Sequence, residues 1–244
     1  MNNQIQFRQA IHLRDRSCLI TRVREFECDC AHIIPYTICD KYAKDFIYDI
    51  RNGLFLCKNL HALYDKLYWT FDIYDIKYNP LTNKYSSRLI ILPNHMNLSV
   101  NNYKDAYVDI SIETYPFIYA HYQVFISVNF EMKHNIEQLY YEIVTEDPIF
   151  KHICTHELPI DDIINKQFRQ YLMNQGLISV VNDEYYVNTI IKHKTDQDKN
   201  QYLVWWDHLP YLDASWEPSD HISKQSKDDY HRRLDLKQDQ DYIQ

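Results

Sequence analysis

Side chains that can hold a metal ion gather between positions 29 and 65 of the chain. His61 and Asp65 are four residues apart, so on a helix they share one face. An imidazole and a carboxylate placed in this way can bind one divalent cation together. The alternative is an ordinary pair on a solvent-exposed helix, and the spacing alone does not separate the two interpretations.

Two further polar residues precede this pair. His32 lies in the run 28–34, which is predicted to be a short strand, with Asp29 and Ala31 on its alternate face. Asn52 stands before Gly53 in a turn signal. There its amide can bond to backbone groups of the 36–51 connection and hold His32 in place. The alternative for His32 is a hydrogen-bonded histidine of the core.

The elements that would position these residues form a compact unit. After a helical lead-in over 4–24 come the strand 28–34, the polar connection 36–51 and a second strand over 54–57. Asn59 is a good N-cap for a helix through about Trp69. Alternating residues in 86–130 predict strands that complete the domain.

The segment from Cys18 to Asp72 resembles an HNH endonuclease of the ββα-metal type. Its blocks CLITR, ECDCAHIIPY, NGLFLCKNLHALYD and TFD stand in the order of that family. The resemblance implies that His32 is the general base for a hydrolytic water, with Asn52 and His61 as the other catalytic residues. It also implies one divalent ion, Mg²⁺ or Mn²⁺, held by His61 with Asp65 or Asp29.

The segment departs from the family in two ways. Many relatives bind a structural zinc with two Cys-x-x-Cys pairs, but Thr21 and Leu60 replace one thiol of each pair here, so this zinc is not expected. A zinc site made of Cys18, Cys28, Cys30 and Cys57 is the alternative. Ala31 stands where several relatives have a metal ligand, and Asp29 is the candidate substitute.

Residues 184–222 resemble a chromodomain, through the blocks EYYVNTII, YLVWW and SWEP. This family binds methyl-lysine of histone tails in an aromatic cage. Its cage positions match Tyr185, Trp206 and Leu209, and Asp213 matches an acidic position beside the pocket. Leu209 has no π face, which predicts weak cation recognition. The alternative is that Tyr185, Trp206 and the neighbouring tryptophans, above all Trp216, only pack a small β core.

Composition limits the other functions. Gly53 and Gly176 are the only glycines, which excludes the glycine-rich loops of Walker and Rossmann nucleotide sites. The net charge is −8, and the acidity lies in residues 131–244. The first 24 residues are basic, so Arg14, Arg16 and Arg22 are candidate DNA contacts.

The sequence therefore predicts an α+β protein that acts on DNA. We expect an HNH domain over 1–130 with its core motif at 18–72, an acidic helical connector over 131–182, a chromodomain over 183–235 and a polar tail over 236–244. The alternative function is an inactive adaptor that binds chromatin or DNA and keeps the HNH fold as a scaffold. Because no apolar leader or membrane span is visible, we expect an intracellular protein, nuclear or cytoplasmic, without a nucleotide cofactor.

Overall fold

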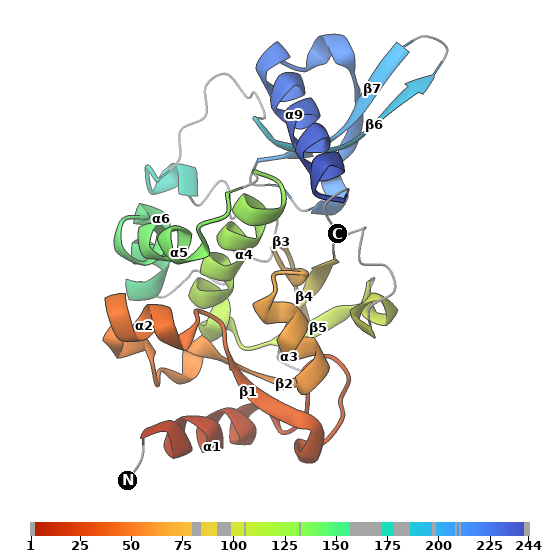
Figure 1. Ribbon diagram of the computed structural model, residues 1–244. Helices are drawn as coiled ribbons and strands as arrows, with labels where there is room; N and C mark the ends of the chain where they lie inside the picture. Colours follow the sequence, from red (N-terminus) through yellow and green to blue (C-terminus); the bar gives the residue numbers. More distant parts are fainter. Residues whose placement is uncertain are drawn as a thin grey trace.

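The computed structural model describes residues 3–79, 84–91, 99–104, 106–131, 133–156, 172–177, 186–196, 199–207, 209 and 211–241. An N-terminal part begins with α1 at one end of the molecule, and a C-terminal part forms the other end (Figure 1). The N-terminal part contains α1 (Asn3–Asp15), β1 (Cys28–His32), α2 (Tyr36–Tyr42), β2 (Gly53–Cys57), α3 (Lys58–Asp65), β3 (Trp69–Asn79), β4 (Lys84–Ile91), β5 (Tyr107–Ile110), α4 (Tyr115–Asn129), α5 (Ile136–Thr145) and α6 (Pro148–Thr155). The C-terminal part contains β6 (Val187–Asp196), β7 (Lys199–Trp206), β8 (Ser215–Pro218) and α9 (Lys224–Asp241).

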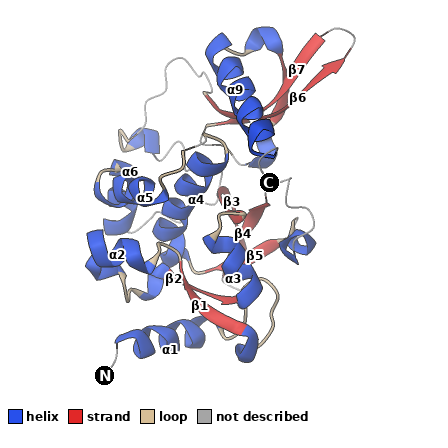
Figure 2. Ribbon diagram, in the orientation of Figure 1, coloured by secondary structure: helices blue, strands red, loops and turns tan. Residues whose placement is uncertain are grey.

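The strands form small antiparallel sheets that helices separate (Figure 2). Their orders are β1-β2, β3-β4-β5 and β6-β7-β8 in the described part of the chain. Within the first sheet, His32 is the register partner of Gly53. The mixed α+β class predicted from the sequence is confirmed.

Gly53 leaves room for the side chains of α1 where this helix packs on the β1-β2 pair. A Cβ atom at this position would lie 2.0 Å from Cδ1 of Ile11, which is far inside van der Waals contact. The predicted turn at Asn52-Gly53 is shifted, because a 3-10 turn occupies Ile50–Asn52 and Gly53 is already extended, with φ −137°. The glycine therefore serves packing rather than the turn.

Helix α3 is shorter than the sequence predicts. It begins at Lys58, with Cys57 rather than Asn59 at the N-cap position. It ends at Asp65 because Leu67 adopts a left-handed conformation, with φ 57°, and the chain enters β3 at Trp69. The early end leaves Asp65 in the last turn of the helix, next to the start of β3.

The prediction of strands throughout 86–130 is correct for β4 and β5 and wrong for residues 115–129, which form α4. This helix is buried on nearly all sides, including Phe117, Ile118 and Phe125, so its sequence has no polar face and no helical period. Its many aromatic and β-branched residues are typical of strands, which is why the sequence pattern predicted a strand here. No helix among the described residues is long and apolar enough to span a membrane.

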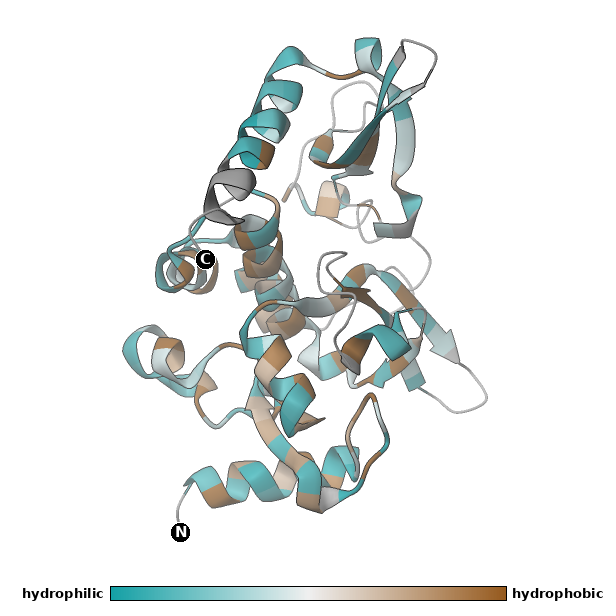
Figure 3. Ribbon diagram, turned by 45° about the vertical axis from the view of Figure 1, so that its right-hand side comes forward, coloured by the Kyte–Doolittle hydropathy of each residue, from teal (hydrophilic) through white to brown (hydrophobic). Residues whose placement is uncertain are grey.

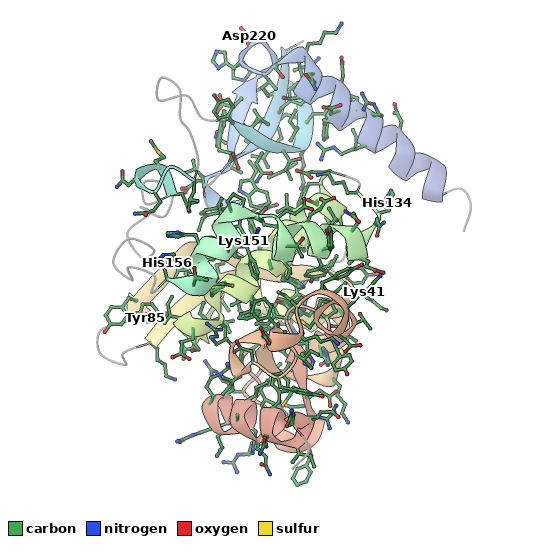
Figure 4. The ribbon with its side chains drawn as sticks, turned by 90° about the vertical axis from the view of Figure 1, so that its left-hand side faces the viewer. Lys41, Tyr85, His134, Lys151, His156 and Asp220 are labelled. Atoms are coloured by element: carbon green, nitrogen blue, oxygen red, sulfur yellow. The ribbon has the colours of Figure 1, made fainter. Side chains whose placement is uncertain are left out.

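The segment expected to be a connector belongs in large part to the N-terminal core. Helices α5 and α6 pack against α4, and α5 also packs against α2. Leu139, Ile143 and Phe150 are buried in the main hydrophobic cluster. Lys41, at the edge where α2 meets α5, pairs with Glu137 (Figure 4). The expected connector also covers 157–171 and 178–182, which lie outside the described residues.

The C-terminal part is a three-stranded curved sheet with α9 packed on one face. Ile190, Val204 and Tyr230 form its small core. Most of α9 is hydrophilic (Figure 3). Its described residues add Tyr230 and Leu234 to this small core. The helix runs to Asp241, so the expected tail at 236–244 begins as a continuation of α9.

Trp205 of β7 joins the two parts. Its side chain is 0% exposed and belongs to the main N-terminal cluster rather than to the core beside α9. The rings of Tyr122 and Phe130, both from the α4 region, meet it edge-on, with centroids 5.9 and 5.7 Å away. The C-terminal part therefore completes the core of the N-terminal part.

Polar contacts reinforce this junction. The carboxylate of Asp72 in β3 is fully buried and accepts hydrogen bonds from the backbone N–H groups of Tyr74 and Tyr211, at 3.0 and 2.8 Å. Burial raises the pKa of Asp72 to about 7. On the other side of Trp205, the guanidinium of Arg233 donates to the carbonyl of Phe130 at the C-terminal end of α4, where a cation is favoured.

We expect Trp205→Ala to lower the free energy of unfolding by roughly 3–5 kcal/mol, because it empties a fully buried site in the shared core. Trp216→Ala is the matched control, since Trp216 is 40% exposed, and we expect less than about 1 kcal/mol for it. Urea titrations followed by circular dichroism measure both values. Equal losses in the two variants would contradict the shared core.

We expect the stability of the protein to fall as the pH rises from about 4 to 7, because over this range Asp72 is ionised in the unfolded chain and still protonated in the folded protein. The folded state holds the Asp72 proton more tightly than the unfolded chain, because the carboxyl pKa is about 7 when folded and near 3.9 in an unfolded chain. The effect is on the order of 4 kcal/mol. Asp72→Asn cannot ionise, so the difference between its urea stability and that of the wild type should depend on pH. A constant difference from pH 4 to 8 would refute the assignment.

Candidate active site

His32 stands at the end of β1 with its ring fixed by three neighbours. Nε2 lies 2.8 Å from the carbonyl oxygen of Ile47. A carbonyl only accepts, so Nε2 carries the ring proton and Nδ1 keeps a lone pair. Phe7 stacks on the imidazole at 4.7 Å and Tyr36 meets it edge-on at 6.0 Å, both between ring centroids. Partial burial lowers the pKa of His32, which keeps the ring neutral at pH 7.

Asn52 links the segments on either side of His32. Its buried side chain accepts from the N–H of Ile34 at 2.8 Å and donates to the carbonyls of Ile34 and Phe46, at 3.2 and 3.1 Å. Ile34 lies shortly after His32 in the chain. Phe46 directly precedes Ile47, whose carbonyl oxygen accepts a hydrogen bond from the imidazole. The amide thus sets the distance between the His32 ring and its backbone acceptor.

His61 lies between two carboxylates. Its Nε2 is 3.3 Å from Oδ2 of Asp65, one helical turn further along α3, and its Nδ1 is 3.9 Å from Oδ2 of Asp29 on β1. Partial burial raises the pKa of Asp65. Because the carboxylates face opposite ring nitrogens, one cation on His61 can share only one of them in this arrangement. The other carboxylate would accept a hydrogen bond from the second ring N–H.

The two carboxylates line different cavities of the N-terminal part. His32, His61 and Asp65 line one cleft of about 420 Å³. Asp29 lines a smaller, neighbouring cleft of about 220 Å³ with Arg8 and His12, and Cys30 lines both clefts. Asp65 therefore lies in the same cleft as His32, whereas Asp29 approaches the other nitrogen of His61. Among the described residues, no group of three His, Cys, Asp or Glu side chains could hold a metal ion, and Ala31 is fully buried.

The remaining thiols of the Cys-x-x-Cys positions have protein partners. The backbone N–H of Thr21 lies 3.4 Å from Sγ of Cys18, and the thiol of Cys57 donates to Oδ1 of Asn59 at 2.9 Å. Cys18, Cys57 and Leu60 are buried in the main cluster. Hydrophobic packing thus holds this part of the fold together.

The three predicted DNA contacts are not equivalent. Arg14 is engaged inside the protein: it pairs with Asp15 and donates to the carbonyls of Ile50 and Gly53, at 2.9 and 2.6 Å. These contacts fix α1 to the β1-β2 pair, so the guanidinium of Arg14 has a structural role and is not available as a DNA contact. Arg16 is exposed, and Arg22 pairs with Asp109 on the surface at 3.2 Å.

In the C-terminal part, Trp206 is partly buried on the α9 side of the sheet, and its indole N–H donates to Ser215 at 2.9 Å. Leu209 and Asp213 are half-buried in the loop after β7. The carbonyl of Leu209 accepts from the indole of Trp205, so this loop is also part of the junction. Tyr185 lies outside the described residues.

The expectation that Trp216 packs in the β core is wrong. Its ring is 40% exposed on the face of the sheet away from α9, and the ammonium group of Lys194 lies 4.4 Å from its centroid. The reason is the pairing of β8 with β7. Trp216 stands opposite Leu203, which points away from the small core, whereas Val204 points into it.

Three residues that line the His32 cleft were not predicted from the sequence. Tyr36 begins α2 within the segment predicted to be a connection, and Ile136 and Tyr140 come from α5. The hydroxyl of Tyr140 donates to the carbonyl of Ile33, 107 residues earlier, at 3.4 Å. Such a contact depends on tertiary packing and leaves no pattern in either segment.

Comparison with known families agrees with these two parts. The sequence model of the HNH endonuclease family matches residues 18–72, which include β1, β2, α3 and the start of β3. That of the chromo (chromatin organisation modifier) domain matches residues 185–233. No curated protein and no solved structure matches the chain. The predicted identity is confirmed: the chain carries an HNH endonuclease domain followed by a chromodomain.

Proposed function

We propose that the protein is a metal-dependent DNA endonuclease that its chromodomain positions on chromatin. One observation carries this proposal. A neutral His32, bound through Nε2 to the Ile47 carbonyl, shares a cleft with the His61–Asp65 pair inside the segment that matches the HNH family. A base and a ligand pair side by side are what hydrolysis of a phosphodiester requires.

His32 acts as the general base in this proposal. Its free Nδ1 takes a proton from the attacking water, and the imidazolium that forms keeps its Nε2–H bond to the Ile47 carbonyl. That bond stabilises the charged ring and prevents it from turning. Asn52 is a positioning residue, because it orients the two backbone segments around His32 and does not line the cleft.

His61 and Asp65 would hold the divalent ion on the Nε2 side of the imidazole. An imidazole and a carboxylate suit Mn²⁺ better than Mg²⁺, whereas the family resemblance favours Mg²⁺. Such an ion supplies Lewis-acid neutralisation of charge on the phosphate and the leaving oxygen. Asp29, across the Nδ1 side, would orient the ring of His61.

The alternative function is a non-cleaving adaptor that binds DNA or chromatin. Two observations favour it: Ala31 is a buried apolar residue where relatives have a metal ligand, and the net charge of the chain is −8. An adaptor would use the HNH fold only to support the chromodomain. In that case the wild-type protein would bind DNA and never cut it.

We expect the wild-type protein to nick supercoiled plasmid with Mn²⁺ or Mg²⁺ and not with EDTA. His32→Ala should lower the rate by a factor of about 10² or more while DNA affinity stays nearly unchanged, because only the base is lost. His221→Ala, at an exposed histidine of the chromodomain, is the matched control and should nick at the wild-type rate.

Gel analysis of nicking and fluorescence anisotropy of DNA binding measure these effects. Full activity of His32→Ala would remove His32 as the base. DNA binding by the wild type without nicking in either ion would instead favour the adaptor.

We expect a trimethyl-lysine peptide of the histone H3 tail to bind weakly, because Leu209 has no ring at the third cage position. Leu209→Tyr should tighten binding and make it depend on methylation. Calorimetry with the methylated and unmethylated peptides measures both. Micromolar affinity of the wild type with strong methyl dependence would contradict this assignment of the cage.

A further inference from the structure

The cleft of His32 is lined by apolar residues as well as by the proposed catalytic groups. Its volume of about 420 Å³ is that of a small-molecule pocket. His32, His61 and Asp65 line it together with Pro35, Tyr36 and Ile136. Tyr36 is 46% exposed and Ile136 41% exposed, so apolar surface is presented at the mouth of the cleft.

The charges of the cleft do not suit recognition of duplex DNA through its phosphates. Among the described residues, those that line it include no Lys or Arg, and Asp65 adds a carboxylate. Proteins that grip duplex DNA rely on lysine and arginine contacts to the backbone. Arg14, the nearest predicted contact on α1, is occupied by Asp15 and by backbone carbonyls. Affinity at this cleft must therefore come from another part of the nucleotide.

Tyr36 provides a surface for that contact. Its ring stands edge-on to the His32 imidazole, with centroids 6.0 Å apart, so a base on the ring of Tyr36 would leave its phosphate close to His32. Tyrosine stacks on any base, but only if the base has left the helical stack. Ile136 and Pro35 would enclose the same base from the sides.

We propose that the cleft binds an unpaired DNA base against Tyr36, so that the enzyme acts on single-stranded or bulged DNA in preference to perfect duplex. This inference rests on the proposed function for the position of the cleaved phosphate. It adds the substrate class: a strand with an unstacked nucleotide at the point of attack.

The test measures binding separately from cleavage. Three fluorescein-labelled DNAs of one sequence are titrated by anisotropy with His32→Ala protein in EDTA: a perfect duplex, a duplex with one bulged adenine, and the same bulge with an abasic site. We expect the bulged adenine to bind about tenfold more tightly than the abasic bulge, because the two differ only in the stacking base.

Substitutions in the cleft test whether Tyr36 makes the contact with the base. Tyr36→Leu should abolish the difference between the bulged adenine and the abasic bulge, whereas Tyr36→Phe should retain it. Tyr78→Ala, at a tyrosine of β3 that is 36% exposed, is the matched control and should also retain it. If Tyr36→Leu does not fold, Ile136→Ser tests the same wall.

Equal affinity of wild-type protein for the bulged adenine and the abasic bulge would overturn the proposal, even if plasmid is nicked. Conversely, a preference for the bulged adenine in a protein that nicks no DNA would support the base site and refute the endonuclease. The two failures are therefore distinguishable.

Discussion

The geometry around His32 depends on one buried amide, that of Asn52. Its oxygen accepts from the N–H of Ile34 and its nitrogen donates to the carbonyl of Phe46, so one side chain joins the end of β1 to the loop before β2. The Ile47 carbonyl, which fixes the tautomer of His32, follows directly in that loop. Because these backbone groups are buried, leaving them unpaired would cost free energy, and the loop has little freedom to move.

A second constraint joins the two domains. Trp205 enters the core of the HNH domain, and the buried carboxylate of Asp72 binds a backbone N–H of the chromodomain. The loop that contains Leu209 and Asp213 also supplies Tyr211 to this junction. The chromodomain is thus a structural part of the protein, and its orientation relative to the His32 cleft follows from packing rather than from a linker.

The surroundings of His61 define what the site can bind. Asp65 and Asp29 approach opposite nitrogens of the same ring, so they have different roles around any ion. Only Asp65 shares the cleft of His32. Apolar residues such as Pro35 and Ile136 line the same cleft, so the proposed metal ligands and the proposed base site lie in one cavity.

The sequence alone determined the ββα arrangement and its candidate residues. Short-range spacing was enough. His61 and Asp65 are one helical turn apart, and the run around His32 is a strand both in the prediction and in the structure. The same holds for the chromodomain strands, where SWEP follows YLVWW at the family spacing. These features depend on residues that are close in the chain, so the spacing of residues in the sequence is enough to predict them.

Tertiary structure decided the rest. A helix buried on nearly all sides, such as α4, has no polar face for periodicity to reveal. The place of Asp65 in the cleft of His32, the contact of Arg14 with the carbonyl of Gly53 and the contact of Tyr140 with Ile33 depend on segments that meet only after folding. Trp205 and Trp216 are both tryptophans, yet Trp205 is buried in the core and Trp216 is exposed, because they occupy different places in the sheet.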